Sequence, residues 1–186
     1  MSIGEVEVLR RDGSSVALGR FWRENDCMVM FLRHFACPSC SARLTAFLPR
    51  LHELVDLGVG VVLVGAGSVR ALGAFAARMR LDEGPVELVV SPDLAAYRAA
   101  GLERSRWSAF GPRSVAAAIA LYVGGHGAAR ADDDGDVLQQ GGVLYVTRAG
   151  EVAYRHADRH LGDGPDWPAL FQAALASAAA RPGVLV

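Results

Sequence analysis

The chain has 186 residues, 52% of them hydrophobic, and a formal net charge of -1. This length can bury the core of one domain, and a nearly neutral chain has no general electrostatic attraction to nucleic acid or to an anionic membrane surface. All 19 lysine-or-arginine positions hold arginine, so mechanisms that need a Schiff-base or P-loop lysine are excluded. No apolar run approaches the roughly 18 residues of a membrane span, and the N-terminus predicts no secretory signal.

The N-terminal part predicts a hairpin followed by a buried strand. Short apolar stretches at 6–9 and 15–18 flank Asp12-Gly13, a turn dipeptide whose residues tolerate positive φ. The continuous apolar run 27–32 predicts a central strand covered on both faces. Apolar residues then recur at helical spacing over 39–57, and Pro49 is expected to kink that helix because it donates no hydrogen bond.

The rest of the chain alternates between short apolar runs, typical of buried strands, and apolar residues at helical spacing. Later strands are expected at 59–64, 85–90, 143–147 and 151–154. Later helices are expected at 68–80, 92–100, 114–122 and from Asp166 to about 180. Residues 124–140 form a polar loop with a solvated acidic run at 132–136, and the tail from about 181 is expected to fray. Strands alternating with helices predict βαβ crossovers, hence an α/β fold in a single domain over 1–186.

The element Cys37-Pro38-Ser39-Cys40 lies where the apolar run 27–32 gives way to a helix. A helix N-terminus lowers a thiol pKa, and thiols three residues apart are neighbours on one helical face, close enough for a disulfide. We expect Cys37, on an exposed first turn, to be the attacking thiolate and Cys40 to resolve the oxidised product. Pro38 stiffens the turn, and Ser39 supports the site.

Arg33 and His34 come just before this element. Treated as strand residues they point to opposite faces, so at most one would face Cys37 and lower its pKa. Their alternative roles are a structural ion pair and a partly buried histidine. Metal binding through His34, Cys37 and Cys40, with Cys27 as fourth ligand, is the chemical rival, although Cys27 is expected to be a core residue.

Other candidate groups carry a weaker signal. His126, His156 and His160 are expected in loops with no nucleophile at a diagnostic spacing. Trp107, Phe110 and Tyr122 are expected in the core, with a hydrophobic mouth beside the dithiol as the alternative. Three cysteines, an odd number, do not predict a disulfide framework, so we expect a reducing cytoplasm.

Two segments carry a family resemblance. Residues 31–40, ending in Cys37-Pro38-Ser39-Cys40, and the hairpin 136–156 resemble the AhpC/TSA-type, peroxiredoxin-like branch of the thioredoxin-fold superfamily. The resemblance implies a thioredoxin-like fold, with a central mixed sheet flanked by helices and an N-terminal hairpin, and thiol redox chemistry. The sequence differs from the family's peroxidase signature Pro-x-x-x-Thr-x-x-Cys, because Met30 and His34 occupy the Pro and Thr positions.

The resemblance also implies that Gln140, Gly141 and Gly142 face the dithiol. Paired glycines at a strand entry allow close backbone approach, although a flexible turn leading into a strand is an equal interpretation.

The expected activity is that of a peroxiredoxin-like thiol oxidoreductase that uses Cys37 and Cys40 to reduce disulfides or hydroperoxides. The alternatives are an organic or lipid (endo)peroxide reductase with an apolar pocket, and a non-catalytic redox-sensing or metal-binding module. No cofactor or metal is expected, and an external thiol or protein would supply electrons. Expected partners are this donor, a peroxide or disulfide substrate and a second copy of the chain, with no nucleic acid or membrane.

Overall fold

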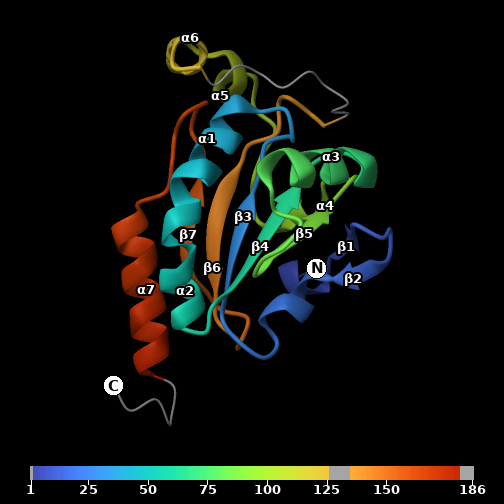
Figure 1. The fold of residues 1–186 in the computed structure, drawn as a ribbon, viewed down its shortest axis with the longest axis vertical. Coiled ribbons are helices and arrows are strands. Elements are labelled where there is room, and N and C mark those ends of the chain that lie inside the picture. Colours follow the sequence, from blue (N-terminus) through green and yellow to red (C-terminus); the bar gives the residue numbers. More distant parts are fainter. Residues whose placement is uncertain (1, 126–134, 181–186) are drawn as a thin grey trace.

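The computed structural model describes residues 2–125 and 135–180, and seven strands in this part of the chain form one sheet (Figure 1). The strands are β1 (Glu7–Arg10), β2 (Ser15–Ala17), β3 (Cys27–Phe31), β4 (Gly60–Gly65), β5 (Val86–Val90), β6 (Gly142–Val146) and β7 (Val152–Ala157). Their order in the sheet is β2-β1-β5-β4-β3-β6-β7. Strands β3, β4 and β5 pair in parallel and the other neighbours are antiparallel, so the sheet is mixed, as expected.

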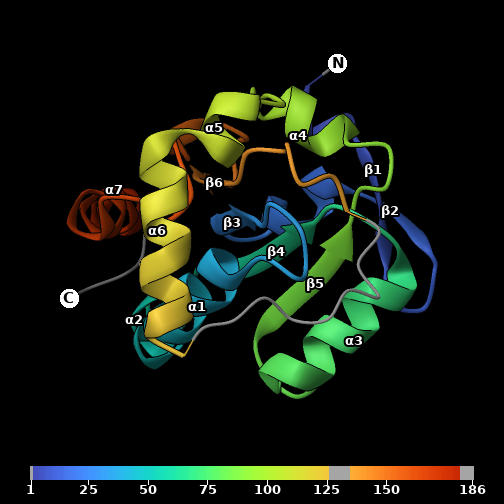
Figure 2. The same cartoon turned by 90° about the horizontal axis from the view of Figure 1, so that it is seen from above.

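Helices cover both faces of this sheet. The helices are α1 (Pro38–Phe47), α2 (Leu51–Asp56), α3 (Val69–Met79), α4 (Ala95–Ala99), α5 (Arg106–Phe110), α6 (Pro112–Val123) and α7 (Trp167–Ala179), with 3₁₀ turns η1 (Ile3–Glu5), η2 (Leu18–Trp22) and η3 (Leu48–Arg50). Helices α1, α2, α3 and α7 bury apolar side chains against one face, and η2 and α4 against the other. Helices α5 and α6 lie beyond the sheet, over the start of α1 (Figures 1 and 2).

Strand β3 is the centre of the core. Its side chains alternate between the two apolar layers, with Met28 and Met30 on the side of α1, and Cys27, Val29 and Phe31 on the other. All five are fully buried. A strand covered on both faces must be apolar at every position, which explains the uninterrupted run in the sequence.

The elements expected from the sequence are largely confirmed. Pro49 interrupts the first long helix as expected, since the 3₁₀ turn η3 separates α1 from α2. Ser68 and Asp166 cap α3 and α7 through their side chains. Helix α5 was missed because it is a single short turn of helix, capped by Ser105 and ended at Gly111. His126, residues 132–134 of the acidic run and the tail from 181 lie outside the described residues.

The segment that joins β3 to α1 is fixed by long-range contacts. The Tyr97 hydroxyl donates to the carbonyls of Leu32, at 2.5 Å, and Val64, at 3.0 Å. The Phe35 ring packs over Gly65, where a Cβ would overlap it. The dithiol helix is therefore positioned by the ends of β4 and by α4, and not by its own sequence alone.

We predict that Gly65→Ala lowers the free energy of unfolding by about 1–3 kcal/mol, because the new methyl group must displace the Phe35 ring. The matched control is Gly73→Ala, inside α3, where a Cβ meets nothing within 4 Å. Alanine is the better helix former there, so the free energy of unfolding of this variant rises by about 0.5–1 kcal/mol. Urea unfolding of both variants provides the measurement, and equal effects would contradict the role assigned to Gly65.

Candidate active site

The first turn of α1 presents both cysteines of the dithiol. Cys37 is the N-cap of α1 and Pro38 its first residue; the Cys37 N–H donates to the His34 carbonyl at 3.2 Å, closing the turn that enters the helix. Both cysteines are free thiols and each is only 1% exposed. The expectation of an exposed first turn was wrong, because α5, α6 and the segment after β7 cover it.

The local dipoles make the two thiols unequal. A hydrogen bond from Cys40 lowers the pKa of the Cys37 thiol; burial opposes the change, whereas the N–H groups of Cys40 and Ser39 and the charge of Arg33 add to it. That same hydrogen bond and then burial raise the pKa of Cys40 well above its ordinary value. The backbone N–H of Arg33 donates to the Cys40 sulfur at 3.3 Å. Cys37 is therefore the more readily ionised of the two thiols, and Cys40 donates a hydrogen bond to it.

Arg33 and His34 both lie beside Cys37. Strand β3 ends at Phe31, so the strand alternation that would separate the two side chains does not apply, and both line one cavity with Cys37. Arg33 is 2% exposed, and its guanidinium donates to the Ser108 hydroxyl at 3.1 Å and to the Ser108 carbonyl at 3.3 Å. The expectation that at most one of them faces Cys37 directly stays a prediction.

The cavity beside Cys37 has a volume of about 400 Å³ and a mostly apolar wall. It is lined by Arg33, His34, Cys37, Pro38, Ala109, Phe110, Ser114, Val115, Ala118, Ile119, Val137 and Leu161. The dithiol segment, α5 and α6 supply most of this wall. Cys37 is thus buried from bulk solvent but forms part of the wall of a space that a small apolar molecule could enter.

Three aromatic residues of this region do not lie in the core. Trp107, Phe110 and Tyr122 are 75%, 64% and 77% exposed. Phe110 lines the cavity at Cys37, in agreement with the alternative of a hydrophobic mouth. Because α5 and α6 lie beyond the sheet, no layer of residues 2–125 or 135–180 covers their outer faces.

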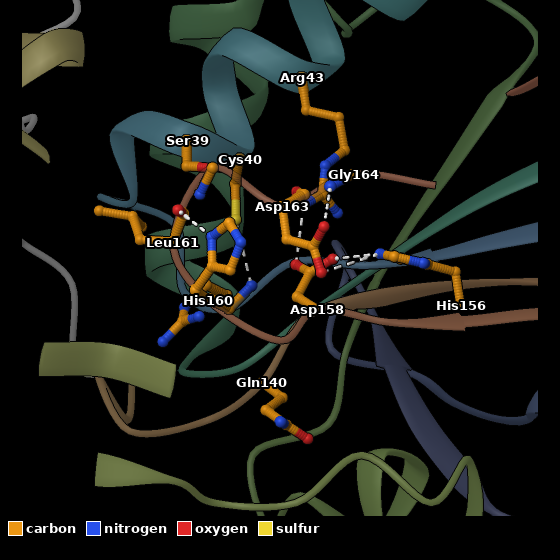
Figure 3. A network of polar contacts seen from close by, with 12 residues as sticks. Ser39, Cys40, Arg43, Gln140, His156, Asp158, His160, Leu161, Asp163 and Gly164 are labelled. Atoms are coloured by element: carbon orange, nitrogen blue, oxygen red, sulfur yellow. Dashed lines mark hydrogen bonds and ion pairs between the residues drawn. The ribbon is translucent and has the colours of Figure 1, made fainter. Parts of the chain in front are cut away.

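The Gln139–Gly142 segment contacts Arg33 rather than the sulfur atoms. Gln140 exchanges hydrogen bonds with the backbone of Glu103 and points away from Cys40 (Figure 3). A Cβ on Gly141 would lie 2.7 Å from Asp158 Oδ2 and 2.8 Å from the Phe31 carbonyl. Gly142 pairs with Phe31 at the start of β6. The two glycines do allow close backbone approach, but to Asp158, the Phe31 carbonyl and the His156 carbonyl, and Gln140 does not face the dithiol.

A buried polar cluster behind Cys40 could not be inferred from the sequence. Arg43 of α1 donates to Asp158 Oδ2 at 2.8 Å and to the Asp163 carbonyl (Figure 3). His156, expected in a loop, belongs to β7, and its Nε2 lies 3.3 Å from Asp158 Oδ1 and 3.8 Å from Asp163 Oδ2. Ser39 joins the same segment, since its hydroxyl accepts the Gly162 N–H at 3.0 Å. The only signal in the sequence is that Arg43 follows Cys40 by one helical turn.

The geometry separates Cys27 from the other two thiols. Cys27 packs in the apolar layer on the face of the sheet opposite α1, and burial raises the pKa of its thiol, with the charges of Asp26 and Glu87 adding to the effect. The core role expected of Cys27 is confirmed, and it cannot complete a ligand set with His34, Cys37 and Cys40. Within residues 2–125 and 135–180, no three His, Cys, Asp or Glu side chains gather as a metal ion would require.

Comparison with known proteins gives the family. The model of the AhpC/TSA antioxidant enzyme family matches residues 43–160, a region that starts just after the dithiol. Human Peroxiredoxin-like 2C is 28% identical over 171 residues, covering 87% of this chain and 74% of that protein. Human prostamide/prostaglandin F synthase is 34% identical over 158 residues, covering 77% of this chain and 72% of that protein.

A solved structure agrees with the fold. Peroxiredoxin Q of Xanthomonas campestris superimposes with a TM-score of 0.66 and 16% identity, over 95% of this chain and 93% of that chain. No helix in the described residues is both long and apolar enough to cross a membrane. With its mixed sheet, its cysteine pair at the start of α1 and these matches, the chain belongs to the AhpC/TSA antioxidant enzyme family and is a peroxiredoxin-like, thiol-dependent oxidoreductase.

Proposed function

We propose that the protein reduces organic hydroperoxides, with Cys37 as the attacking thiolate and Cys40 as the resolving thiol. The apolar cavity whose wall contains Cys37 is the observation that carries this proposal. An alkyl group can occupy such a cavity while the peroxide oxygens lie against the sulfur, which holds the reacting atoms together. Hydrogen peroxide has no alkyl group and gains nothing from the apolar wall.

The chemistry proceeds in two balanced steps. The Cys37 thiolate attacks the terminal oxygen of ROOH, the O–O bond breaks, and the alkoxide takes up a proton and leaves as the alcohol ROH. Cys37 is then a sulfenic acid. The Cys40 sulfur attacks it, an S–S bond forms, and the departing hydroxide combines with the proton lost by Cys40 to give water. Two electrons from an external thiol then reduce the disulfide.

Arg33 and His34 line the cavity together with Cys37, and they supply hydrogen-bond donors for the peroxide oxygens. His34 stands where the family's peroxidase signature has its threonine. In this reading a ring nitrogen replaces the threonine hydroxyl. This assignment gives both residues a role that the spacing in the sequence does not predict.

The burial of Cys37 favours a hydroperoxide over a protein disulfide as substrate. A thiol that is 1% exposed offers no surface for a folded partner, whereas an elongated small molecule can reach it through the cavity. The human relative whose name refers to prostamide and prostaglandin F synthesis has lipid products. The name supports a lipid-derived substrate for this chain.

The electrons come from thiols, so the reaction as proposed needs no cofactor. The three free thiols suit a reducing cytoplasm, where a low-molecular-weight thiol or a protein thiol would act as donor. The cytoplasmic location and a homodimer stay predictions. Fractionation of the native host and light scattering of the purified protein would test them.

We predict that the reduced protein consumes cumene hydroperoxide with a higher kcat/KM than hydrogen peroxide, measured with a thiol donor in excess. Cys37→Ser abolishes both activities. Ile119→Ser, in the cavity wall, lowers kcat/KM for the organic peroxide about three- to tenfold, a loss of roughly 1 kcal/mol of apolar contact, and leaves the hydrogen peroxide rate unchanged.

The matched control is Val123→Ser, on the same helix but outside the cavity and 80% exposed, which changes neither rate. Full activity in Cys37→Ser would contradict the assigned nucleophile. Oxidation of the dithiol once, with no continued consumption of peroxide, would indicate a redox sensor instead of an enzyme.

We also predict that the rate at which iodoacetamide alkylates Cys37 rises with pH and reaches half its maximum below the ordinary thiol pKa of about 8.5. Because the pKa of Cys37 is lowered, the thiolate forms at lower pH than in a free cysteine. The alkylation rate therefore rises at lower pH and levels off above the midpoint. Cys40→Ala removes the hydrogen bond that contributes most and moves the midpoint upward, whereas Cys27→Ala does not. Peptide mass spectrometry against pH measures this, and an unmoved midpoint in Cys40→Ala would refute the assigned cause.

A further inference from the structure

Arg43 is a buried cation placed one helical turn after Cys40. Its side chain is 8% exposed, and Figure 3 shows it running beside Cys40 towards Asp158 and Asp163. A buried guanidinium is costly unless acceptors surround it, and here the Asp158 carboxylate at 2.8 Å and the Asp163 carbonyl provide them. These two acceptors come from the segment after β7, so that segment fixes where the charge lies.

Cys40 is the group that gains from a nearby cation. It is 1% exposed, and it must lose its proton before it can attack an oxidised Cys37. Its hydrogen bond with Cys37 and its burial raise its pKa, whereas the charge of Arg43 and the N–H of Arg33 act in the opposite direction. Residues three apart on a helix are neighbours, so Arg43 and Cys40 share one side of α1.

The other charged groups around Arg43 leave its charge available to Cys40. From β7, His156 faces Asp158 and Asp163 but not Arg43. The Asp163 carboxylate accepts hydrogen bonds from the Arg159 side chain and from its backbone N–H. Asp158 is therefore the carboxylate that pairs directly with Arg43 among the described residues.

We propose that Arg43 is a positioning residue for the resolving step: clamped between Asp158 and Asp163, it stabilises the Cys40 thiolate as that sulfur attacks the Cys37 sulfenic acid. In the step, the Cys37 S–O bond breaks, the S–S bond forms, and hydroxide leaves to join the proton released by Cys40. The proposal rests on the proposed function for its role in turnover. The claim that the charge of Arg43 stabilises the Cys40 thiolate concerns Cys40 alone, and it is tested without peroxide.

The first test measures the ionisation of Cys40 in a Cys37→Ala background, by the pH dependence of its alkylation. Arg43→Gln raises the midpoint by about one pH unit, a tenfold change in the ionisation constant. Arg43→Lys keeps the charge, so its midpoint stays close to that of the protein with Arg43. The matched control Arg159→Gln removes an arginine of the same cluster whose side chain is 76% exposed, and it leaves the midpoint unchanged.

The second test follows sulfenic acid formation and disulfide formation during turnover with cumene hydroperoxide. Dimedone traps the sulfenic acid, and mass spectrometry quantifies the Cys37–Cys40 disulfide. Arg43→Gln slows disulfide formation about tenfold near neutral pH and moves its pH profile upward. Sulfenic acid formation changes by less than about twofold, because Arg43 is not in the cavity wall. The step affected therefore separates this role from a general loss of structure.

Removal of Arg43 alone leaves Asp158 buried without its cation, which can unfold the protein. The variant Arg43→Gln/Asp158→Asn removes both charges, and the proposal predicts a higher Cys40 midpoint and slower disulfide formation, each by less than in Arg43→Gln because loss of the Asp158 charge favours the thiolate. An unshifted Cys40 midpoint in folded Arg43→Gln or in this double variant overturns the proposal. Failure of wild-type protein to form sulfenic acid would overturn the proposed function instead, while the Cys40 midpoint still decides the role of Arg43.

Discussion

The structure depends on the burial of one carboxylate, that of Asp158, which is 1% exposed. Its side chain holds Arg43 of α1, its N–H donates to the Gly141 carbonyl at 2.9 Å, and its carbonyl accepts from the Ser108 hydroxyl at 3.4 Å. Ser108 in turn holds Arg33. One residue thereby connects the dithiol helix, the entry of β6 and the elements that cover the site. Since a buried charge must be compensated, these contacts act together.

This arrangement explains how a reactive thiol can be buried. Burial alone would keep Cys37 protonated, yet its position at the start of α1 supplies N–H donors, and Cys40 and Arg33 add a hydrogen bond and a charge. Cys37 is only 1% exposed beside the cavity lined by α5 and α6, and low exposure to bulk water strengthens these electrostatic effects. Helices α5 and α6, placed over the N-terminus of α1, therefore form much of the cavity wall, while the hydrogen bond from Cys40, the N–H groups of the first turn and the charge of Arg33 lower the pKa of Cys37 against the effect of burial.

The proposed reduction of peroxide needs two sulfur atoms with opposite properties at successive steps. In that mechanism Cys37 is ionised before oxidation, whereas Cys40 stays protonated and donates until Cys37 has become a sulfenic acid. The unequal surroundings of the two thiols provide this order, since only Cys37 receives the N–H groups of the first turn, while Arg43 lies on the side of Cys40. The matched family region runs from residue 43 to residue 160, so it contains Arg43, His156 and Asp158 of the cluster behind Cys40 but not Asp163.

The sequence by itself determined the α/β fold, the central strand 27–32 and the dithiol at a helix start, because hydrophobic periodicity, capping residues and thiol spacing are local signals. It could not place Phe110 at the cavity or both Arg33 and His34 beside Cys37, because these depend on where β3 ends and on what lies beyond the sheet. The contact between Arg43 and Asp158 joins residues 115 positions apart. Only the tertiary structure decided that cluster, since charge pairing across such a distance follows from packing and leaves no local pattern.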